Sequence, residues 1–199
     1  MNGSDLRIGA VVLAAGQASR FGSAKQTLPI KGVPMVRRVA MTALEAALSP
    51  VVVVTGAYNE EVAHSLDGLA VHLADNPDWS SGMGTSLAFG VAVATAREAS
   101  LHAVLVMLAD QPAITAADLR GMLDAHASAP ERILAARYEG HLGPPCIFPR
   151  AIFEELTTLG GPHGARSLLE RHAALVDAYD LPMAAFDIDT PADYAAWPP

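Results

Sequence analysis

The sequence predicts an α/β fold: a single domain over residues 1–199, built around a doubly wound, mostly parallel β-sheet. Its length of 199 residues suits one domain, because domains usually contain about 100–200 residues. Its composition, 51% hydrophobic and 17% charged, excludes a disordered chain. Short apolar runs alternate with longer stretches of helical periodicity, and this rhythm is typical of right-handed βαβ units.

Four short apolar runs predict strands at residues 8–13, 51–55, 69–73 and 103–108. The second and fourth runs are apolar on both faces, which is typical of strands buried inside a parallel sheet. The longer segments predict helices over residues 34–48, 59–66, 83–97 and 116–127. Pro34 suits a first helical turn, where its missing N–H costs nothing, and Thr115 followed by Asp118 predicts an N-cap.

The last third of the chain is less regular. It predicts strands at 132–138 and 146–148 with a loop at 140–145 between them, and helices at 151–159 and 164–172. The sequence Gly160-Gly161-Pro162 separates those two helices. A late strand at 184–188 and a terminal helix from Thr190 to Trp197 complete the prediction.

Composition excludes several classes of protein. The net charge of −8 argues against a general nucleic-acid binder. The single cysteine, Cys146, excludes an internal disulfide and a cysteine-rich zinc site, and we expect it to be a core thiol. No apolar run approaches the roughly 18–20 residues of a membrane helix. We therefore expect a cytoplasmic protein that binds neither nucleic acid nor membranes.

The charge is distributed unevenly along the chain. Residues 1–59 carry a net charge of +4, whereas residues 60–199 carry −12. This pattern suits a protein that holds a compact anion near its N-terminal end and a divalent cation elsewhere. A chance asymmetry of solvated surfaces would give the same pattern, so the chemistry must be argued from motifs.

The strongest motif is LAAGQASRFGSAK, residues 13–25, which directly follows the first predicted strand. In open α/β sheets, ligands bind beyond the carboxyl ends of the strands. Small residues there let backbone N–H groups approach phosphate oxygens, and Arg20 and Lys25 add two cations. We expect Lys25 to be an exposed loop residue that contributes little to folding stability. The alternative is a surface turn with incidental cations. The spacing fits neither a P-loop nor a GxGxxG dinucleotide site.

Three aspartates follow predicted strands. Asp110 ends the strand at 103–108, on the same sheet edge as the first motif. Asp187 and Asp189 lie two residues apart, so their side chains share one side if the segment is extended. Mg²⁺ usually takes one or two carboxylates plus substrate phosphates, so Asp110 with either of the others predicts a metal site. Alternatively, Asp110 is a turn residue, and Asp189 or Thr190 caps the last helix.

A second glycine-containing segment, NPDWSSGMGTSL at residues 76–87, opens a predicted helix. Its N–H groups near Gly82 would face outward, and Ser86 lies one turn into the helix. Such small polar groups suit the edge of a nucleotide base. The alternative is an ordinary helix start.

Taken in order, these segments resemble one family. LAAGQASRFGSAK, NPDWSSGMGTSL, DQP (110–112), GPPCIF (143–148), GARSLL (164–169) and DIDTPADY (187–194) are similar to the signature of the MobA-like nucleotidyltransferases, and within them most closely to the molybdenum cofactor cytidylyltransferases. The resemblance runs from about Ile8 to Trp197 and implies a Rossmann-like nucleotidyltransferase fold. Guanylyltransferases of the group typically have LAGG, so Ala15 favours cytosine.

The resemblance implies an activity: transfer of CMP from CTP to the terminal phosphate of molybdopterin, with release of pyrophosphate, in the presence of Mg²⁺ or Mn²⁺. A molybdenum hydroxylase would then be the recipient of the cofactor. The residues implied as catalytic are Arg20, Lys25 and Asp110, and those implied as nucleotide-binding are Leu13, Ala14, Ala15, Gly16, Gly82 and Ser86. Asp110 would bind the metal with Asp187 or Asp189, and 143–145 and 164–166 would lie toward the pterin.

Two other functions compete with this one. A cytidylyltransferase for another phosphorylated acceptor, such as a sugar or polyol phosphate, would use the same nucleotide motifs. A non-catalytic carrier of the molybdenum cofactor belongs to a different class, and it would not need the intact cations or Asp110.

Overall fold

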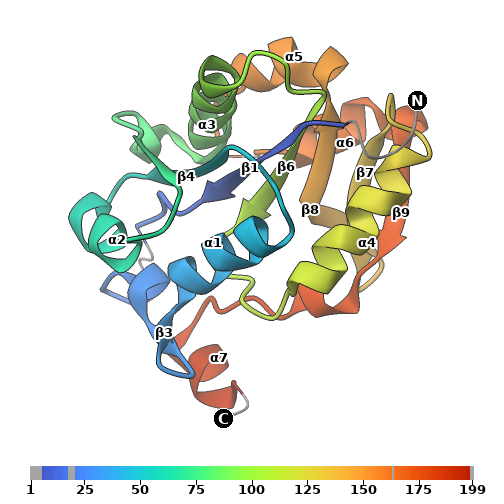
Figure 1. Ribbon diagram of the computed structural model, residues 1–199. Helices are drawn as coiled ribbons and strands as arrows, with labels where there is room; N and C mark the ends of the chain where they lie inside the picture. The colour runs from blue at the N-terminus through green and yellow to red at the C-terminus, as the bar shows by residue number, and fades with distance from the viewer. Residues whose placement is uncertain (1–5, 18–20, 163, 198–199) are drawn as a thin grey trace.

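The computed structural model describes residues 6–17, 21–162 and 164–197 (Figure 1). Its main feature is a seven-stranded sheet in the order β5–β4–β1–β6–β8–β7–β9. The strands are β1 (Ile8–Leu13), β4 (Val51–Thr55), β5 (His72–Asp75), β6 (Ala103–Leu108), β7 (Ile133–Tyr138), β8 (His141–Pro149) and β9 (Val176–Asp180). Only β8 is antiparallel to its neighbours β6 and β7, and every other pair in this sheet is parallel.

Helices cover both faces of the sheet, so the predicted doubly wound α/β class is confirmed (Figure 1). One face packs against α1 (Met35–Glu45), α2 (Asn59–Ser65) and α4 (Ala116–Ala127), and the other against α3 (Met83–Arg97), α5 (Phe153–Thr157) and α6 (Arg166–Arg171). Strand β1 illustrates the division: Ala10 and Val12 belong to the first core, Val11 and Leu13 to the second. Side chains that alternate along each strand therefore build two separate hydrophobic layers.

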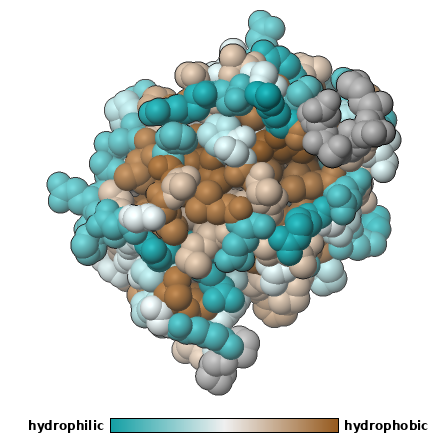
Figure 2. All heavy atoms as spheres, in the orientation of Figure 1, coloured by the Kyte–Doolittle hydropathy of each residue, from teal (hydrophilic) through white to brown (hydrophobic). Residues whose placement is uncertain are grey.

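Apolar and polar residues are also separated on the surface. On the face drawn in Figure 1, hydrophobic residues gather across the middle and hydrophilic residues lie around the margin (Figure 2). None of the helices in the described part of the chain is both long and apolar enough to cross a membrane.

Glycine lets α3 approach the sheet closely. A Cβ at Gly90 would lie 2.5 Å from Val11 Cγ1 and 2.6 Å from Val54 Cγ2, which is closer than packed atoms come. The helix therefore lies directly against β1 and β4. Its N-terminus is consequently held beside the carboxyl ends of those strands.

A small second sheet and a terminal helix lie at the same end of the molecule. Strands β2 (Pro29–Ile30) and β3 (Val33–Pro34) form a hairpin, and α7 (Pro191–Ala196) follows the last loop. Ile188 is buried against Ile30 and Met35, and the Tyr194 hydroxyl donates to the Pro29 carbonyl over 2.8 Å. The C-terminal segment is thereby fastened to the region that follows the first motif.

Three predicted elements are wrong. The strand at 69–73 instead covers His72–Asp75, and the loop at 140–145 belongs to β8, which pairs with β7 through a turn at Glu139 and Gly140. No strand forms at 184–188, and the 3-10 turn Pro182–Ala185 lies there instead. In the large sheet the prediction missed β9, an edge strand whose sequence VDAYD alternates and is half-exposed, and it also missed the short hairpin strands β2 and β3. A search for apolar runs cannot find such a strand.

Candidate functional site

The site lies at β1, where the order of the strands reverses: β4 and β5 lie on one side of β1, and β6 and the later strands lie on the other. Strand β1 pairs with β4 on one side and with β6 on the other, and Leu13 lies opposite Leu108. The segments that follow these two strands therefore leave the same sheet edge side by side, the usual position of ligand sites in open α/β sheets.

A pocket of about 450 Å³ opens at this edge. It is lined by Leu13, Ala14, Ala15, Gly16, Gln17, Lys25, Gln26, Trp79, Ser80, Gly82, Met83, Ser86, Leu108, Ala109, Asp110, Pro162 and Asp189. All six residues predicted to bind the nucleotide are among them. Arg20, the other predicted cation, lies outside the described residues.

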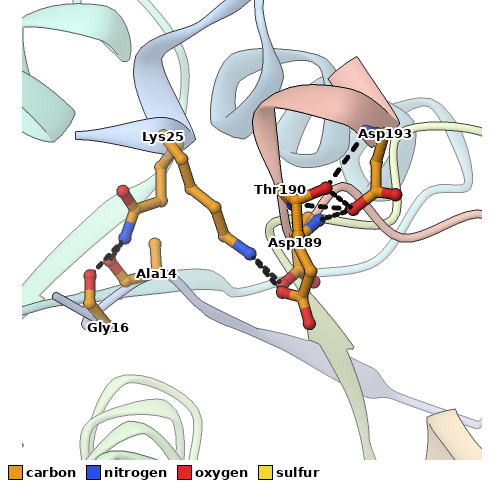
Figure 3. Close-up of polar contacts among 8 residues, drawn as sticks. Ala14, Gly16, Lys25, Asp189, Thr190 and Asp193 are labelled. Atoms are coloured by element: carbon orange, nitrogen blue, oxygen red, sulfur yellow. Dashed lines mark hydrogen bonds and ion pairs between the residues drawn. The ribbon is translucent and has the colours of Figure 1, made fainter. Parts of the chain in front are cut away.

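Lys25 is the centre of the charged end of the pocket (Figure 3). It begins a short 3-10 turn (Lys25–Thr27), and its Nζ donates to Asp110 Oδ2 over 2.9 Å and to Asp189 Oδ1 over 2.7 Å. Burial alone would lower the pKa of Lys25, but the two carboxylates outweigh that effect and raise the pKa above its ordinary value. The side chain therefore carries a positive charge at neutral pH.

The expectation that Lys25 is exposed is wrong. Only 9% of the residue is accessible to solvent, and its ammonium group lies against Asp110 and Asp189 at the pocket wall. A buried ammonium needs partners. Asp110 and Asp189 supply them from positions 85 and 164 residues further along the chain.

The two candidate metal residues near the C-terminus have different positions. The N–H of Ile188 donates to the Asp110 carbonyl over 3.0 Å, and its side chain is buried. This contact holds the segment that contains Asp187 and Asp189 next to Asp110. Asp189 lines the pocket and contacts Lys25, whereas Asp187 is exposed and does not line it. Although the residue is exposed, partial desolvation of its carboxyl group and the nearby charges of Asp110 and Asp189 raise the pKa of Asp187.

Thr190 is the cap of the last helix. Its hydroxyl accepts from the Asp193 N–H, and Asp193 Oδ2 accepts from the Thr190 N–H over 2.7 Å (Figure 3). This reciprocal arrangement is a capping box. Of the two residues that the sequence offered as caps, Thr190 takes that position, and the Asp189 carboxylate is turned to the pocket.

The loop after β1 is held from behind by a residue that the sequence analysis missed. Gln26 is 3% exposed, and its Nε2 donates to the carbonyls of Ala14 (3.1 Å) and Gly16 (2.7 Å) (Figure 3). The loop is also tied to the neighbouring strand, because the Ala14 N–H donates to the Val54 carbonyl over 2.9 Å. No sequence pattern points to Gln26, since its partners are backbone atoms that only folding brings near.

The start of α3 forms the opposite wall. Gly82 lines the pocket with a φ of +116°, and a Cβ there would lie 2.5 Å from the Gly161 carbonyl oxygen. The N–H of Gly84 donates to that same carbonyl over 2.9 Å. The loop at 160–162 therefore accepts a hydrogen bond from one of the helix N–H groups that the sequence analysis expected to face outward. Pro162 of the same loop lines the pocket.

Ser86 is held by a second residue that the sequence analysis did not single out as a site residue. Asn76 is 2% exposed, and its Nδ2 donates to Ser86 Oγ over 3.0 Å and to Thr85 Oγ1 over 3.1 Å. Ser86 therefore keeps its own hydroxyl proton for another partner at the pocket wall. Trp79 lies nearby, packed over Gly56, where a Cβ would come within 2.7 Å of the indole side chain.

The segments implied to lie toward the pterin are not part of this pocket. Residues 143–145 lie in β8, where the Pro144 carbonyl accepts from Gln111 Nε2 over 3.2 Å. Gly164 lies against Met83, with a Cβ position 2.9 Å from the sulfur, and only Met83 lines the pocket. Cys146 is fully buried, as expected of a core thiol, and burial raises its pKa.

The carboxylates suit a cation that completes its coordination with substrate oxygens. Within residues 6–17, 21–162 and 164–197, no three His, Cys, Asp or Glu side chains form a ready-made metal site. Asp110 Oδ1 is nevertheless buried without a hydrogen-bond partner among them, and Asp189 lies on the other side of Lys25 Nζ. Two carboxylates with substrate phosphates form the usual Mg²⁺ environment in proteins.

The fold and the position of the pocket suit a nucleotidyltransferase, and sequence comparison identifies the family. Residues 10–176 match the family described as the MobA-like NTP transferase domain. The chain belongs to this family, as its motifs implied.

Two relatives cover most of the chain. Nicotine blue oxidoreductase of Paenarthrobacter nicotinovorans is 32% identical over 179 residues, 85% of each chain. The purine catabolism protein PucB of Bacillus subtilis (strain 168) is 32% identical over 200 residues, 92% of each chain.

Among solved structures, Rv0371c from Mycobacterium tuberculosis H37Rv superposes with a TM-score of 0.79, at 28% identity over 96% of each chain. A structure of Rv0371c in complex with manganese superposes with a TM-score of 0.74, at 27% identity over 95% of this chain and 96% of that one.

Proposed function

We propose that this nucleotidyltransferase transfers CMP from CTP to the terminal phosphate of molybdopterin, giving the cytosine dinucleotide form of the cofactor and pyrophosphate. The observation that carries the proposal is the arrangement of Lys25 between Asp110 and Asp189, next to the glycine-containing loop. A triphosphate needs cations, N–H donors and a metal ion together, and the pocket contains an ammonium group, loop N–H groups and two carboxylates that could take a metal.

The loop and Lys25 would hold the phosphates. The N–H groups of Ala15, Gly16 and Gln17 donate to no other described residue, so they remain available to phosphate oxygens. Lys25 would turn from its carboxylates to the β- and γ-phosphates, where negative charge develops as pyrophosphate leaves. Arg20 is proposed to assist it.

Bond making is simple in this reaction. A phosphate oxygen of the acceptor attacks the α-phosphorus, and the bond from that phosphorus to the oxygen bridging to the β-phosphate breaks. The acceptor is already ionised at neutral pH, since the second pKa of a phosphate monoester is about 6. No general base is required, and positioning and charge neutralisation account for the catalysis.

Asp110 and Asp189 would hold the divalent cation. The partnerless Oδ1 of Asp110 fits this role, and manganese bound to Rv0371c supports a divalent cation in this fold. Such a cation supplies neutralisation of phosphate charge. Asp187 is proposed to contribute through its charge, since it lies outside the pocket.

The choice of base is proposed to depend on Ala15 and on the start of α3. Ala15 carries a methyl at the pocket wall where guanylyltransferases of the family typically have glycine. The Ser86 hydroxyl, held by Asn76, is available to a base edge. The methyl suits the smaller ring of cytosine, and the hydroxyl would form a hydrogen bond with its edge.

The test is a panel of four nucleoside triphosphates against molybdopterin, a sugar phosphate, a polyol phosphate and no acceptor, read by pyrophosphate release with Mg²⁺ or Mn²⁺. The proposal is supported if pyrophosphate is released from CTP when molybdopterin is the acceptor and not with any other acceptor. Release with another acceptor points to the other cytidylyltransferase activity, and stoichiometric binding of molybdopterin without release points to a carrier. One relative is named an oxidoreductase, so the same panel includes oxidation of NADH and NADPH.

A further inference from the structure

Gln26 has the features of a residue that shapes the site from behind. It follows Lys25 in one 3-10 turn, and the two side chains take opposite directions. Lys25 reaches the carboxylates, and Gln26 reaches the loop after β1. A single turn thereby connects both sides of the pocket.

The orientation of the Gln26 amide follows from its partners. Its two neighbours within hydrogen-bond distance are the carbonyl oxygens of Ala14 and Gly16, which can only accept. The amide nitrogen must therefore face the loop, and the amide oxygen must face away from it. That oxygen is buried and has no hydrogen-bond partner among the described residues. The contact with the loop thus outweighs the cost of an unsatisfied buried oxygen.

The geometry of the peptide bond turns this contact into control of the loop. In a trans peptide, the carbonyl of one residue and the N–H of the next point in opposite directions. Drawing the carbonyls of Ala14 and Gly16 toward Gln26 therefore turns the N–H groups of Ala15 and Gln17 away from it. Those residues line the pocket, and their N–H groups donate to no other described residue.

We infer that Gln26 is a positioning residue, which fixes the loop at 14–17 so that its N–H groups are preorganised for the phosphates of the nucleotide. The inference rests on the proposed function for the identity of the ligand. Gln26 contacts the loop through two carbonyls and acts on the phosphates only through it.

The test compares Gln26→Met, which removes both donors, with Gln26→Glu, which leaves one O–H donor when the carboxyl group is protonated and none when it is ionised. Burial beside two carbonyls favours the protonated form of the introduced carboxyl group, which donates one hydrogen bond. We expect Gln26→Met to weaken CTP binding about 10-fold or more at all pH values. Gln26→Glu should bind poorly at pH 8 and recover several-fold at pH 5.5. Calorimetric titration measures both, with wild type at each pH as reference.

Gln111→Met is a matched control. Gln111 is 2% exposed, and its Nε2 also donates to two carbonyls, those of Pro144 and Ala184, outside the pocket. Both Met variants should lose comparable thermal stability, while only Gln26→Met loses affinity for CTP. Equal losses of stability with unchanged CTP affinity in Gln26→Met would overturn the inference, because that result describes a purely structural glutamine.

A second measurement separates this inference from the proposed function. Hydrogen exchange of the Ala14 N–H, which donates to the Val54 carbonyl, should be faster in Gln26→Met than in wild type or Gln111→Met, without any nucleotide. Unchanged exchange in Gln26→Met refutes the inference even if CTP binds. Faster exchange together with no binding of CTP by wild type supports the positioning role and refutes the proposed nucleotide.

Discussion

Replacing Lys25 by methionine should reduce both activity and stability. Methionine keeps most of the aliphatic stem and removes the charge that lies 2.9 Å from Asp110 and 2.7 Å from Asp189. Asp110 and Asp189 would then lose the ammonium group that contacts both of them. Removing one partner of a fully buried ion pair costs about 3–5 kcal/mol. Here the carboxylate side chains are 22% and 44% exposed, so water screens part of the repulsion, and we expect a loss of about 1–3 kcal/mol.

The electrostatic origin of this loss can be tested directly. Urea unfolding at pH 7 should show the loss in Lys25→Met, and adding Asp110→Asn should recover part of it, because one of the two repelling charges is gone. Catalysis should fall by about 10²–10³ in kcat/KM, as when one preorganised stabilising group is lost.

The control is Lys31→Met, the same substitution at the other lysine of the chain, which is exposed in the turn between β2 and β3. It should leave stability and activity within experimental error. An inactive Lys25→Met protein with wild-type stability would refute the buried ion-pair argument. A loss of stability that Asp110→Asn does not reduce would refute its electrostatic basis.

Three further outcomes follow from the site. Asp110→Asn should weaken Mn²⁺ binding in the presence of CTP, followed by electron paramagnetic resonance, and lower turnover, and identical Mn²⁺ affinity would argue against a metal at Asp110. Because the folded pKa of Asp187 is raised, its ionisation destabilises the folded state above the ordinary carboxyl pKa of about 4. Asp187→Asn should therefore be more stable than wild type in urea at pH 7, and the two curves should converge near pH 3. Ala15→Gly should raise kcat/KM for GTP only modestly, since one methyl discriminates by about 1–3 kcal/mol, and a wild type that prefers GTP would contradict the cytosine assignment.

The fold was predictable where burial leaves a mark in the sequence. Strands β1, β4 and β6 are continuous apolar runs, and their bounds agree with the prediction. The helices α3 and α4 also have the predicted bounds, and Thr115 caps α4 through a capping box with Asp118. Strand β9 left no such mark, because an edge strand needs only one apolar face.

The site was predictable only as far as sheet topology reaches. Knowing that parallel strands end at one edge was enough to bring Lys25 and Asp110 to one pocket. The burial of Lys25 was not predictable, since it depends on Asp189, 164 residues away. Gln26 and Asn76 were missed as site residues for a related reason: their partners are backbone carbonyls and hydroxyls, which carry no signature in a sequence.

The charged cluster also has a consequence for the order in which the molecule is built. Lys25 leaves the ribosome early, whereas its two carboxylates follow 85 and 164 residues later. Contacts of such separation close large loops and form late in folding. During synthesis, the Lys25 ammonium therefore stays hydrated until Asp110 has been made, and it gains its second carboxylate only when Asp189 follows. A nascent chain, or one that ends before Asp189, would keep the sheet's central strands but lack the second carboxylate. The pocket therefore contains both carboxylate partners of Lys25 only after the segment around Asp189 has packed against the segment around Lys25.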